Sequence, residues 1–592
     1  MSSSCPIGPA AAARAALRLA GALTGSLALS SAGFAQMPPG IQNPVPQGSP
    51  IPFVAPRPAP NVAPGPLLPP PAPADGMPSR SLRITSVTVG GVTAYPGAEI
   101  ARYTDGLIGP ATPLDKVDAA RQAILNRYRG DGYILTTVSG VLDAQGRLRF
   151  QVVEGHIASV KLDRDIGPAG VQVLRFLERL TEEQPISAST LERYLLLAQD
   201  VPGVTVRATL QPSTDEPGAL TLVASVSRRA VSGLAVADNR AFKLTGPIQT
   251  IGVVDFNSFT EYGERTELSL YHAFPNSQTF GQAASEFFIG SSGLRARLYA
   301  GAGPTTPTGA LQDLGYHGFT TVFGGQMTYP VIRSRQQNLN VYGIFDGLES
   351  TIDTFGAGSD GARGLLSRDS LRVLRAGGDY SLSDLWFSDT RPAVNTLTVR
   401  ASQGVPILGA SRAGDANLPR AGEEPQFFKF NAELSRTQTL FYPWEGASVA
   451  LMGLFTGQVS PSVLPPEEQF FLGGLRFTRG FYAGQVVGDN ALAATAELQL
   501  NTPLPADQIG VPWPVTAQFY AFYDWGETWQ NQAVDANARL ASTGGGVRLA
   551  IGERAEVDFE GVGRLTRYPN GNPPGTSGLY GGAFYWRVLL RF

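Results

Sequence analysis

Between residues 82 and 226 the chain changes twice from the alternating apolar pattern of strands to the three-to-four-residue spacing of helices and back. Such a repeat predicts two small α+β modules, which we place at 81–156 and 157–229. An edge strand of each could accept an extended peptide, and the alternative is that both are simple spacers. In the first module we expect a strand at 82–89, a helix capped by Thr112 and Asp115, and a hairpin formed by 135–142 and 148–153. In the second module we expect a strand at 157–162, a helix at 171–180, a second helix capped by Ser189 and Glu192, and a hairpin formed by 204–210 and 220–226.

From residue 230 to residue 592 the helical spacing disappears and apolar and polar side chains alternate, as where Glu556 and Asp558 flank Val557. In a soluble sandwich the apolar face would meet a second sheet, whereas in an outer-membrane barrel it meets lipid and the charged face lines a wet lumen. Roughly 22 residues for each strand and connection predicts a transmembrane antiparallel β-barrel of about 16 strands. The last strand ends on Phe592, the usual form of a closing strand in such barrels.

Composition supports a chain that is mainly β. Of 592 residues 69 are glycine and only 16% are charged, which suits many tight turns and a large surface that does not face water. The net charge of −3 gives no electrostatic reason to expect nucleic acid as a partner. The single cysteine, Cys5, and three scattered histidines predict neither a disulfide nor a metal site.

The N-terminal segment has the features of an export signal. Arg14 and Arg18 precede a short apolar core and the small residues of a cleavage site, which predicts a signal peptide at 1–35. Residues 36–80 contain 16 prolines and should form an extended linker rather than a helix or sheet. The chain is therefore expected to be exported.

A glycine-rich segment at 473–500 differs from an ordinary hairpin loop, because it combines glycines, aromatic residues and one arginine at close quarters. Such a loop could fold back into a cavity, where the guanidinium would need an acidic partner. The residues that stand out are Arg479, Gly480 and Phe481, followed by Gly488 and Asp489.

The export signal, the proline-rich linker, the paired modules, the barrel pattern and this segment form one combination. It resembles the haemolysin secretion/activation family, the outer-membrane transporters of two-partner secretion. The two modules look like the polypeptide-transport-associated (POTRA) domains of that family. In the family the loop enters the barrel and its arginine meets an acidic residue on the inner wall. The resemblance implies that Arg479 pairs with Asp524, which lies in the sequence Phe-Tyr-Asp-Trp-Gly at 522–526. Thr478 stands where the family usually has valine, and the prolines of 36–80 disfavour the plug helix that many members carry.

The resemblance implies an outer-membrane translocator with its POTRA domains in the periplasm. It would capture an unfolded exoprotein, commonly β-helical in the family, and export it through the barrel, with outer-membrane lipid and the barrel assembly machinery as further partners. No phosphate loop, Gly-x-Ser-x-Gly or His-Glu-x-x-His motif occurs, so we expect neither an enzyme nor a cofactor. The alternative is an outer-membrane assembly factor, although those proteins usually carry three or more POTRA domains. A passive porin would need no such modules.

Overall fold

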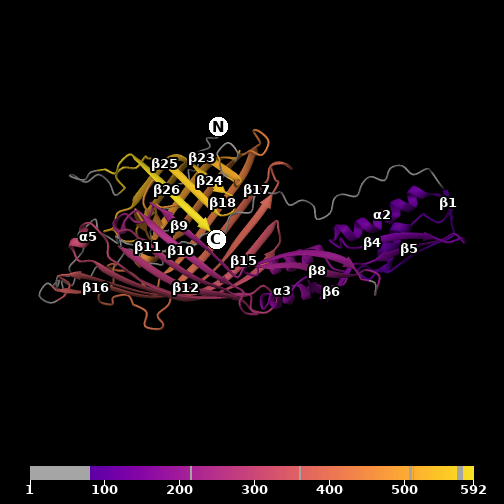
Figure 1. The fold of residues 1–592 in the computed structure, drawn as a ribbon, viewed down its shortest axis with the longest axis horizontal. Coiled ribbons are helices and arrows are strands. Elements are labelled where there is room, and N and C mark those ends of the chain that lie inside the picture. Colours follow the sequence, from indigo (N-terminus) through magenta and orange to yellow (C-terminus); the bar gives the residue numbers. More distant parts are fainter. Residues whose placement is uncertain are drawn as a thin grey trace, which may run out of the picture. The chain divides into compact units, whose positions relative to one another are not determined.

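The expected elements can be compared with a computed structural model of the chain. It describes residues 81–592 apart from 214–215, 276, 359–361, 506–509, 511 and 570–577. The expected signal peptide at 1–35 and proline-rich linker at 36–80 lie outside the described residues. In Figure 1 the modules are drawn in indigo and purple, and the strands of the barrel run from magenta to yellow.

The first module packs a long helix against a small mixed sheet. Its elements are β1 (Ser81–Ile84), β2 (Ser86–Gly90), α1 (Gly97–Ala101), the 3-10 helix η1 (Arg102–Thr104), β3 (Gly109–Pro113), α2 (Leu114–Gly130), β4 (Thr137–Leu142) and β5 (Arg147–Val153). The sheet order is β2-β5-β4, with β2 parallel to β5, while β1 pairs with β3. Ile124, Tyr128 and Phe150 are fully buried between helix and sheet and form the centre of the core.

The second module repeats the same arrangement. Its elements are β6 (His156–Leu162), α3 (Ala169–Leu177), the 3-10 helix η2 (Glu178–Glu182), α4 (Ala188–Gln199), β7 (Val204–Pro212) and β8 (Ala219–Arg228). The sheet order is β6-β8-β7, again with one parallel and one antiparallel pair. Phe176, Leu177 and Leu222 are fully buried in its core. The hairpins expected from the alternating pattern are thus present in both modules.

Both expected helix caps are wrong, because adjacent residues of the chain form other contacts. Thr112 belongs to β3, where it pairs with Leu82 of β1, and its hydroxyl donates to the carbonyl of Leu107 at 2.9 Å. Helix α2 consequently begins after Pro113 without a side-chain cap. Helix α4 begins earlier than expected, because Ser187 Oγ accepts the backbone N–H of Thr190 at 3.3 Å.

Among the described residues, sixteen antiparallel strands close into a barrel, which confirms the expected architecture. They are β9 (Val231–Asp238), β10 (Gln249–Asn257), β11 (Arg265–Ala273), β12 (Gln278–Phe288), β13 (Arg295–Thr305), β14 (His317–Arg333), β15 (Gln337–Phe355), β16 (Arg363–Asp384), β17 (Ala393–Gly404), β18 (Phe428–Phe441), β19 (Ser448–Val459), β22 (Asn490–Leu504), β23 (Val515–Trp529), β24 (Ala538–Ile551), β25 (Ala555–Arg564) and β26 (Gly582–Arg591). A short helix, α5 (Ala310–Asp313), lies between β13 and β14. Strand β26 pairs with β9 and closes the ring.

Side chains along the barrel strands alternate between the lumen and the outer surface. In β25, Glu560 is buried and bonded to other lumen groups, whereas its neighbour Phe559 is exposed and stacks on Phe584 of β26. In β11, Leu268 and Leu270 are likewise exposed on the outside. None of the helices among the described residues combines the length and the apolar character needed to cross a membrane.

Candidate functional site

The glycine-rich segment belongs to a long connection, residues 460–489, which joins β19 to β22 and which we call the lumen loop. It contains the 3-10 helix η5 (Pro466–Glu468) and two short strands, β20 (Phe470–Leu472) and β21 (Val486–Gly488), which pair with each other. Its tip is a tight turn, in which the N–H of Phe481 donates to the carbonyl of Thr478 at 3.1 Å. Phe481 is fully buried among apolar side chains that include Leu472 and Leu540.

At the tip, the side chain of Arg479 reaches two carboxylates of the barrel wall. Its Nε and Nη2 each lie 3.0 Å from Asp524 of β23, and its backbone N–H donates to the same carboxylate at 2.7 Å. Its Nη1 pairs with Glu497 of the adjacent strand β22. Arg479 is 5% exposed and Asp524 is 0% exposed, so water contributes little to the solvation of either charge. Bidentate geometry and burial make this an anchor of the loop.

The Glu497 carboxylate serves two cations. Arg548 of β24 donates to it at 2.7 Å and 3.2 Å, and thus faces Arg479 across the same carboxylate. Each guanidinium also covers an aromatic ring at 3.7 Å from the centroid, Arg479 over Phe522 and Arg548 over Tyr520. Arg548 also lies 3.6 Å from Asp558 of β25, so two guanidinium groups face three carboxylates here, and aromatic faces exclude water from one side.

Gly480 allows the backbone of the tip to approach the wall. A Cβ at this position would lie 2.6 Å from Cβ of Ser542, so a side chain cannot be accommodated without movement. The N–H of Gly480 donates to Ser542 Oγ at 3.2 Å, and its carbonyl accepts from Arg564 Nε at 2.5 Å and from the Tyr585 hydroxyl at 3.1 Å. The close approach thus satisfies both polar groups of this peptide unit.

Arg240, in the connection between β9 and β10, holds the same tip from the other side of the barrel seam. Its guanidinium donates to the carbonyls of Gly474 and Arg479 at 3.2 Å and 3.1 Å, and it pairs with Glu560 of β25 at 2.5 Å. The alternation that puts Glu556 and Asp558 on the charged face of β25 extends to Glu560, but nothing in the sequence indicated that its partner would be Arg240.

The first part of the lumen loop is fixed to a different region of the wall. Glu468 of η5 pairs with Arg375 of β16 and with Lys429 of β18, each at 2.7 Å. Burial opposes the charge of Glu468, but these two cations hold the pKa of its carboxyl at about 2. Because the tip is held by β22 and β23, the loop is attached to two separate parts of the wall.

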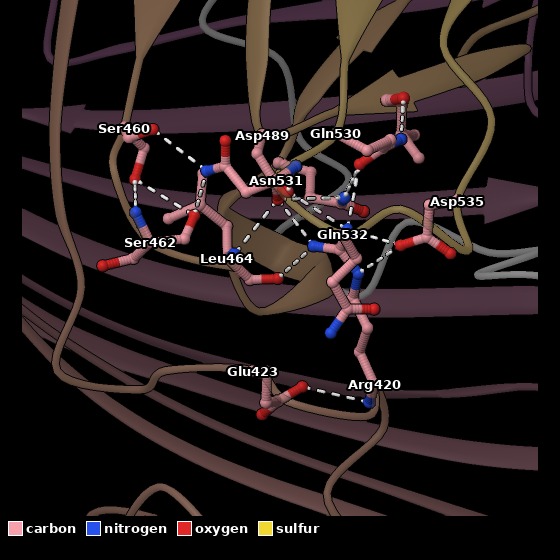
Figure 2. Close-up of polar contacts among 12 residues, drawn as sticks. Arg420, Glu423, Ser460, Ser462, Leu464, Asp489, Gln530, Asn531, Gln532 and Asp535 are labelled. Carbon is pink, nitrogen blue, oxygen red and sulfur yellow. Dashed lines mark hydrogen bonds and ion pairs between the residues drawn. The ribbon is translucent and has the colours of Figure 1, made fainter. Parts of the chain in front are cut away.

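Gly488 and Asp489, at the end of the lumen loop, do not join the Arg479 site. Asp489 is fully buried and accepts from Arg420, which lies in the connection between β17 and β18, at 2.6 Å and 3.1 Å. Arg420 also pairs with Asp535, in the connection between β23 and β24, at 2.6 Å. Figure 2 shows the side chain of Arg420 extending to both carboxylates. We call Arg420, Asp489 and Asp535 the loop clamp, and neither Arg420 nor Asp535 was indicated by the sequence.

Phe592 lies apart from both sites, at the seam of the barrel. Its N–H and carbonyl bond to the carbonyl and N–H of Gly233 at 3.0 Å and 2.9 Å, while its ring is exposed on the outer surface. A Cβ on Gly233 would lie 2.5 Å from the ring of Phe592. In the described part of the chain, no group of three or more His, Cys, Asp or Glu side chains is arranged to hold a metal ion.

Comparisons with known proteins agree with this architecture. The family model of the haemolysin secretion/activation protein ShlB/FhaC/HecB matches residues 379–549, and that of the ShlB-type POTRA domain matches residues 82–155. CdiB from Escherichia coli is similar over 89% of this chain and 93% of that chain, with a TM-score of 0.67 and 19% identity. CdiB from Acinetobacter baumannii is similar over 88% and 91%, with a TM-score of 0.60 and 15% identity. At these identities the structural likeness establishes the fold alone. No curated protein sequence matches the chain.

Proposed function

Because the chain belongs to the haemolysin secretion/activation protein family, whose members are outer-membrane transporters of two-partner secretion, we propose that its lumen loop controls the passage of a secreted partner. The protein is an outer-membrane β-barrel transporter with POTRA domains in the periplasm, and its partner is a secreted exoprotein. The function is transport without catalysis. The observation that carries the proposal is the buried anchor of Arg479 on Asp524 and Glu497, which keeps the loop inside the barrel.

The free edges of the POTRA sheets suit capture of an extended partner. Strand β4 is an edge of the first sheet and β7 an edge of the second, so each presents backbone groups that can pair with another strand. On β4, Val141 is 62% exposed and would supply an apolar contact beside those backbone bonds. An extended chain would be selected over a folded one, because only an extended chain has free backbone groups.

The partner would leave the barrel unfolded and fold outside the cell. No nucleotide is available in the periplasm, so folding outside, into a β-helix as is common among partners in this family, would make export irreversible. The exposed apolar side chains of the barrel strands, such as Leu268, Leu270 and Phe559, would face outer-membrane lipid. The barrel itself would depend on the cell's barrel assembly machinery for insertion.

Deletion of the protein in its native host distinguishes transport from a role in barrel assembly. The proposal predicts that one exoprotein disappears from the culture medium while the levels of other outer-membrane barrels stay unchanged. Restoring the full-length chain should restore that exoprotein, and restoring residues 230–592 behind a signal peptide should give an inserted barrel without export. General loss of outer-membrane barrels would contradict the proposal and favour an assembly factor.

A further inference from the structure

We propose that the loop clamp is the gate of the extracellular mouth, and that Arg420 must release its carboxylates before the secreted partner can pass. This inference rests on the proposed transport function. Since the POTRA domains are periplasmic and lead directly into β9, the connections that follow β9 and every second strand after it are extracellular. The connections 405–427, 460–489 and 530–537 are all of this kind, and the clamp joins one residue from each.

Arg420 is bonded more fully than an ordinary loop arginine. Besides Asp489 and Asp535 it donates to the carbonyl of Leu464 and to Gln530 Oε1, each at 2.9 Å. The residue is 7% exposed, although it lies in a connection that faces the outside of the cell. Charge-assisted bonds to buried carboxylates are strong, and removing one partner leaves the other charge buried and unpaired.

Asp489 connects the loops a second time through its other contacts. Its two oxygens accept the backbone N–H of Leu464 at 3.0 Å and of Asn531 at 2.8 Å, as Figure 2 shows. Asn531 in turn donates to the carbonyls of Ser460 and Ser462. The lumen loop and the connection after β23 are therefore tied by bonds between side chains of each loop and backbone groups of the other, and Arg420 adds the third connection to this pair.

Two of the three connections also share a small apolar core. Leu464 of the lumen loop and Phe427 of the connection after β17 are fully buried against Leu371 and Val373 of β16. Loops that merely project into water have no such core. The extracellular end of the barrel is thus covered by a packed layer, and a chain that leaves the barrel must displace at least part of it.

Three carboxylates beside the clamp, two of them buried and the third, Glu467, half-buried, oppose this closure. Asp369 of β16, Glu423 of the connection after β17 and Glu467 of the lumen loop each have at least one buried oxygen that lacks a hydrogen-bond partner among the described residues. Asp369 has two such oxygens and is almost completely buried. Burying carboxylates together is unfavourable, since each loses hydration and repels the others when charged. The closed layer therefore combines a strong clamp with a destabilising cluster, which suits a gate that must open.

Ion currents through the full-length protein in planar lipid bilayers test the clamp without any cargo. Arg420→Met and, separately, Asp535→Asn should increase the open probability of the pore roughly ten- to a hundredfold, which corresponds to losing charge-assisted bonds. The matched control is Arg297→Met, because Arg297 pairs with Glu267 in the wall at 3.2 Å and contacts none of these loops. Asp535→Asn retains the pair of Arg420 with Asp489, so it decides the question if Arg420→Met does not fold. Unchanged currents in a folded variant would overturn the gate.

Tethering the loops tests whether the gate opens during export. Gln532 donates to the carbonyl of Ala421, so the connections after β17 and β23 touch beside the clamp. The only native cysteine is Cys5, in the expected signal peptide, so Ala421→Cys with Gln532→Cys can be joined by a short reducible thiol crosslinker in intact cells. Crosslinked protein should stop exporting the partner and should recover after reduction, whereas each single cysteine variant should export normally. Normal export through crosslinked protein would contradict the gate, whereas absence of export from the unmodified chain would contradict the transport function instead.

Discussion

Arg479 matters because three of its polar hydrogens reach one buried carboxylate and a fourth contact reaches another. Removing the guanidinium leaves Asp524 buried, while Glu497 keeps Arg548 as a partner. The tip of the lumen loop would then be held by the backbone bond of residue 479 to Asp524, by Arg240, by the contacts of Gly480 and by the packing of Phe481. The anchor therefore depends more on the bonds to Asp524 than on those to Glu497.

We predict that Arg479→Ala inserts normally but exports little partner. Losing charge-assisted bonds shifts the docked loop toward undocked states by roughly ten- to a hundredfold, which should also change pore conductance. Asp524→Ala should produce a similar defect, and the double variant should be no worse than either single variant, because each substitution breaks the same contact. Secreted partner in the medium and heat-modifiable barrel in the membrane are the two measurements.

Glu497→Gln serves as the matched comparison for this cycle. Its defect should be smaller than that of Asp524→Ala, since the neutral amide can still accept one bond from Arg479. Fully additive defects of Arg479→Ala and Asp524→Ala, or normal export by either single variant, would rule out the paired anchor.

The sequence allowed one partner of Arg479 to be proposed, through the family resemblance, and the structure brings Arg479 and Asp524 together. The sequence did not indicate Glu497, Arg240 or Arg420. Each of those contacts depends on the register between strands or on the path of a long loop, and neither can be calculated from local patterns. Arg420 is 69 residues from Asp489, so only the closed barrel places them side by side.

At the scale of the loops, the carboxylate cluster predicts that the extracellular layer depends on pH. Burial raises the pKa of Glu423 to about 9, and the nearby Asp369 adds to the rise, while Arg420 opposes it. The third carboxylate that faces this group is Glu467, whose pKa burial also raises. In the undocked loop Glu423 would ionise near pH 4.5, its ordinary value, so docking is most favourable below that pH. The contribution of Glu423 to the free energy of loop docking is lost as the pH rises toward about 9, by at most about 1.4 kcal/mol per pH unit.

Pore conductance should therefore increase between about pH 5 and about pH 9, and Glu423→Gln should flatten that dependence because the amide cannot ionise. Planar-bilayer currents at several pH values measure the effect. The control is Glu286→Gln, which removes a carboxylate of β12 whose partners, Arg265 and Arg295, belong to the neighbouring wall strands. A pH profile that Glu423→Gln leaves unchanged would contradict the role of the cluster.

The closing strand gives a prediction about insertion. The backbone bonds between Phe592 and Gly233 extend the pairing of β26 with β9, so they protect the seam from lipid. Deleting Phe592 should lower the amount of heat-modifiable barrel in the outer membrane severalfold, without altering the protein that does insert. Equal amounts of deleted and full-length barrel in membrane fractions would exclude this role.

Elements were predictable where one pattern extends over many residues, and not where a single side chain decides. Alternation along the second half of the chain predicted the barrel, because every strand separates lipid from water. The length of that region, at roughly 22 residues for each strand and connection, predicted the strand number. Thr112 and Ser189 both have the spacing of a helix cap, but neither is one. Thr112 is paired in a strand, and the helix near Ser189 already begins after Ser187. Local signals of this kind have several solutions, and packing selects one.

At the scale of the whole molecule, three parts of the chain act in one direction of transport in the proposed function. The POTRA edges would take up an extended partner, and the loop clamp would cover the extracellular end. Between them, the lumen loop is anchored on one part of the barrel wall by Arg479 and on another by Glu468. We propose that the partner passes through the lumen of this barrel and not along its outer surface.

Photo-crosslinking during export tests that claim most directly. Gln518 and Phe519 are neighbours on β23, but Gln518 bonds to Arg548 in the lumen whereas Phe519 is exposed on the outside. A photoreactive amino acid at position 518 should crosslink to the secreted partner while export is in progress, and the same group at position 519 should not. Crosslinks from position 519, or none from position 518 while export continues, would contradict transport through the lumen.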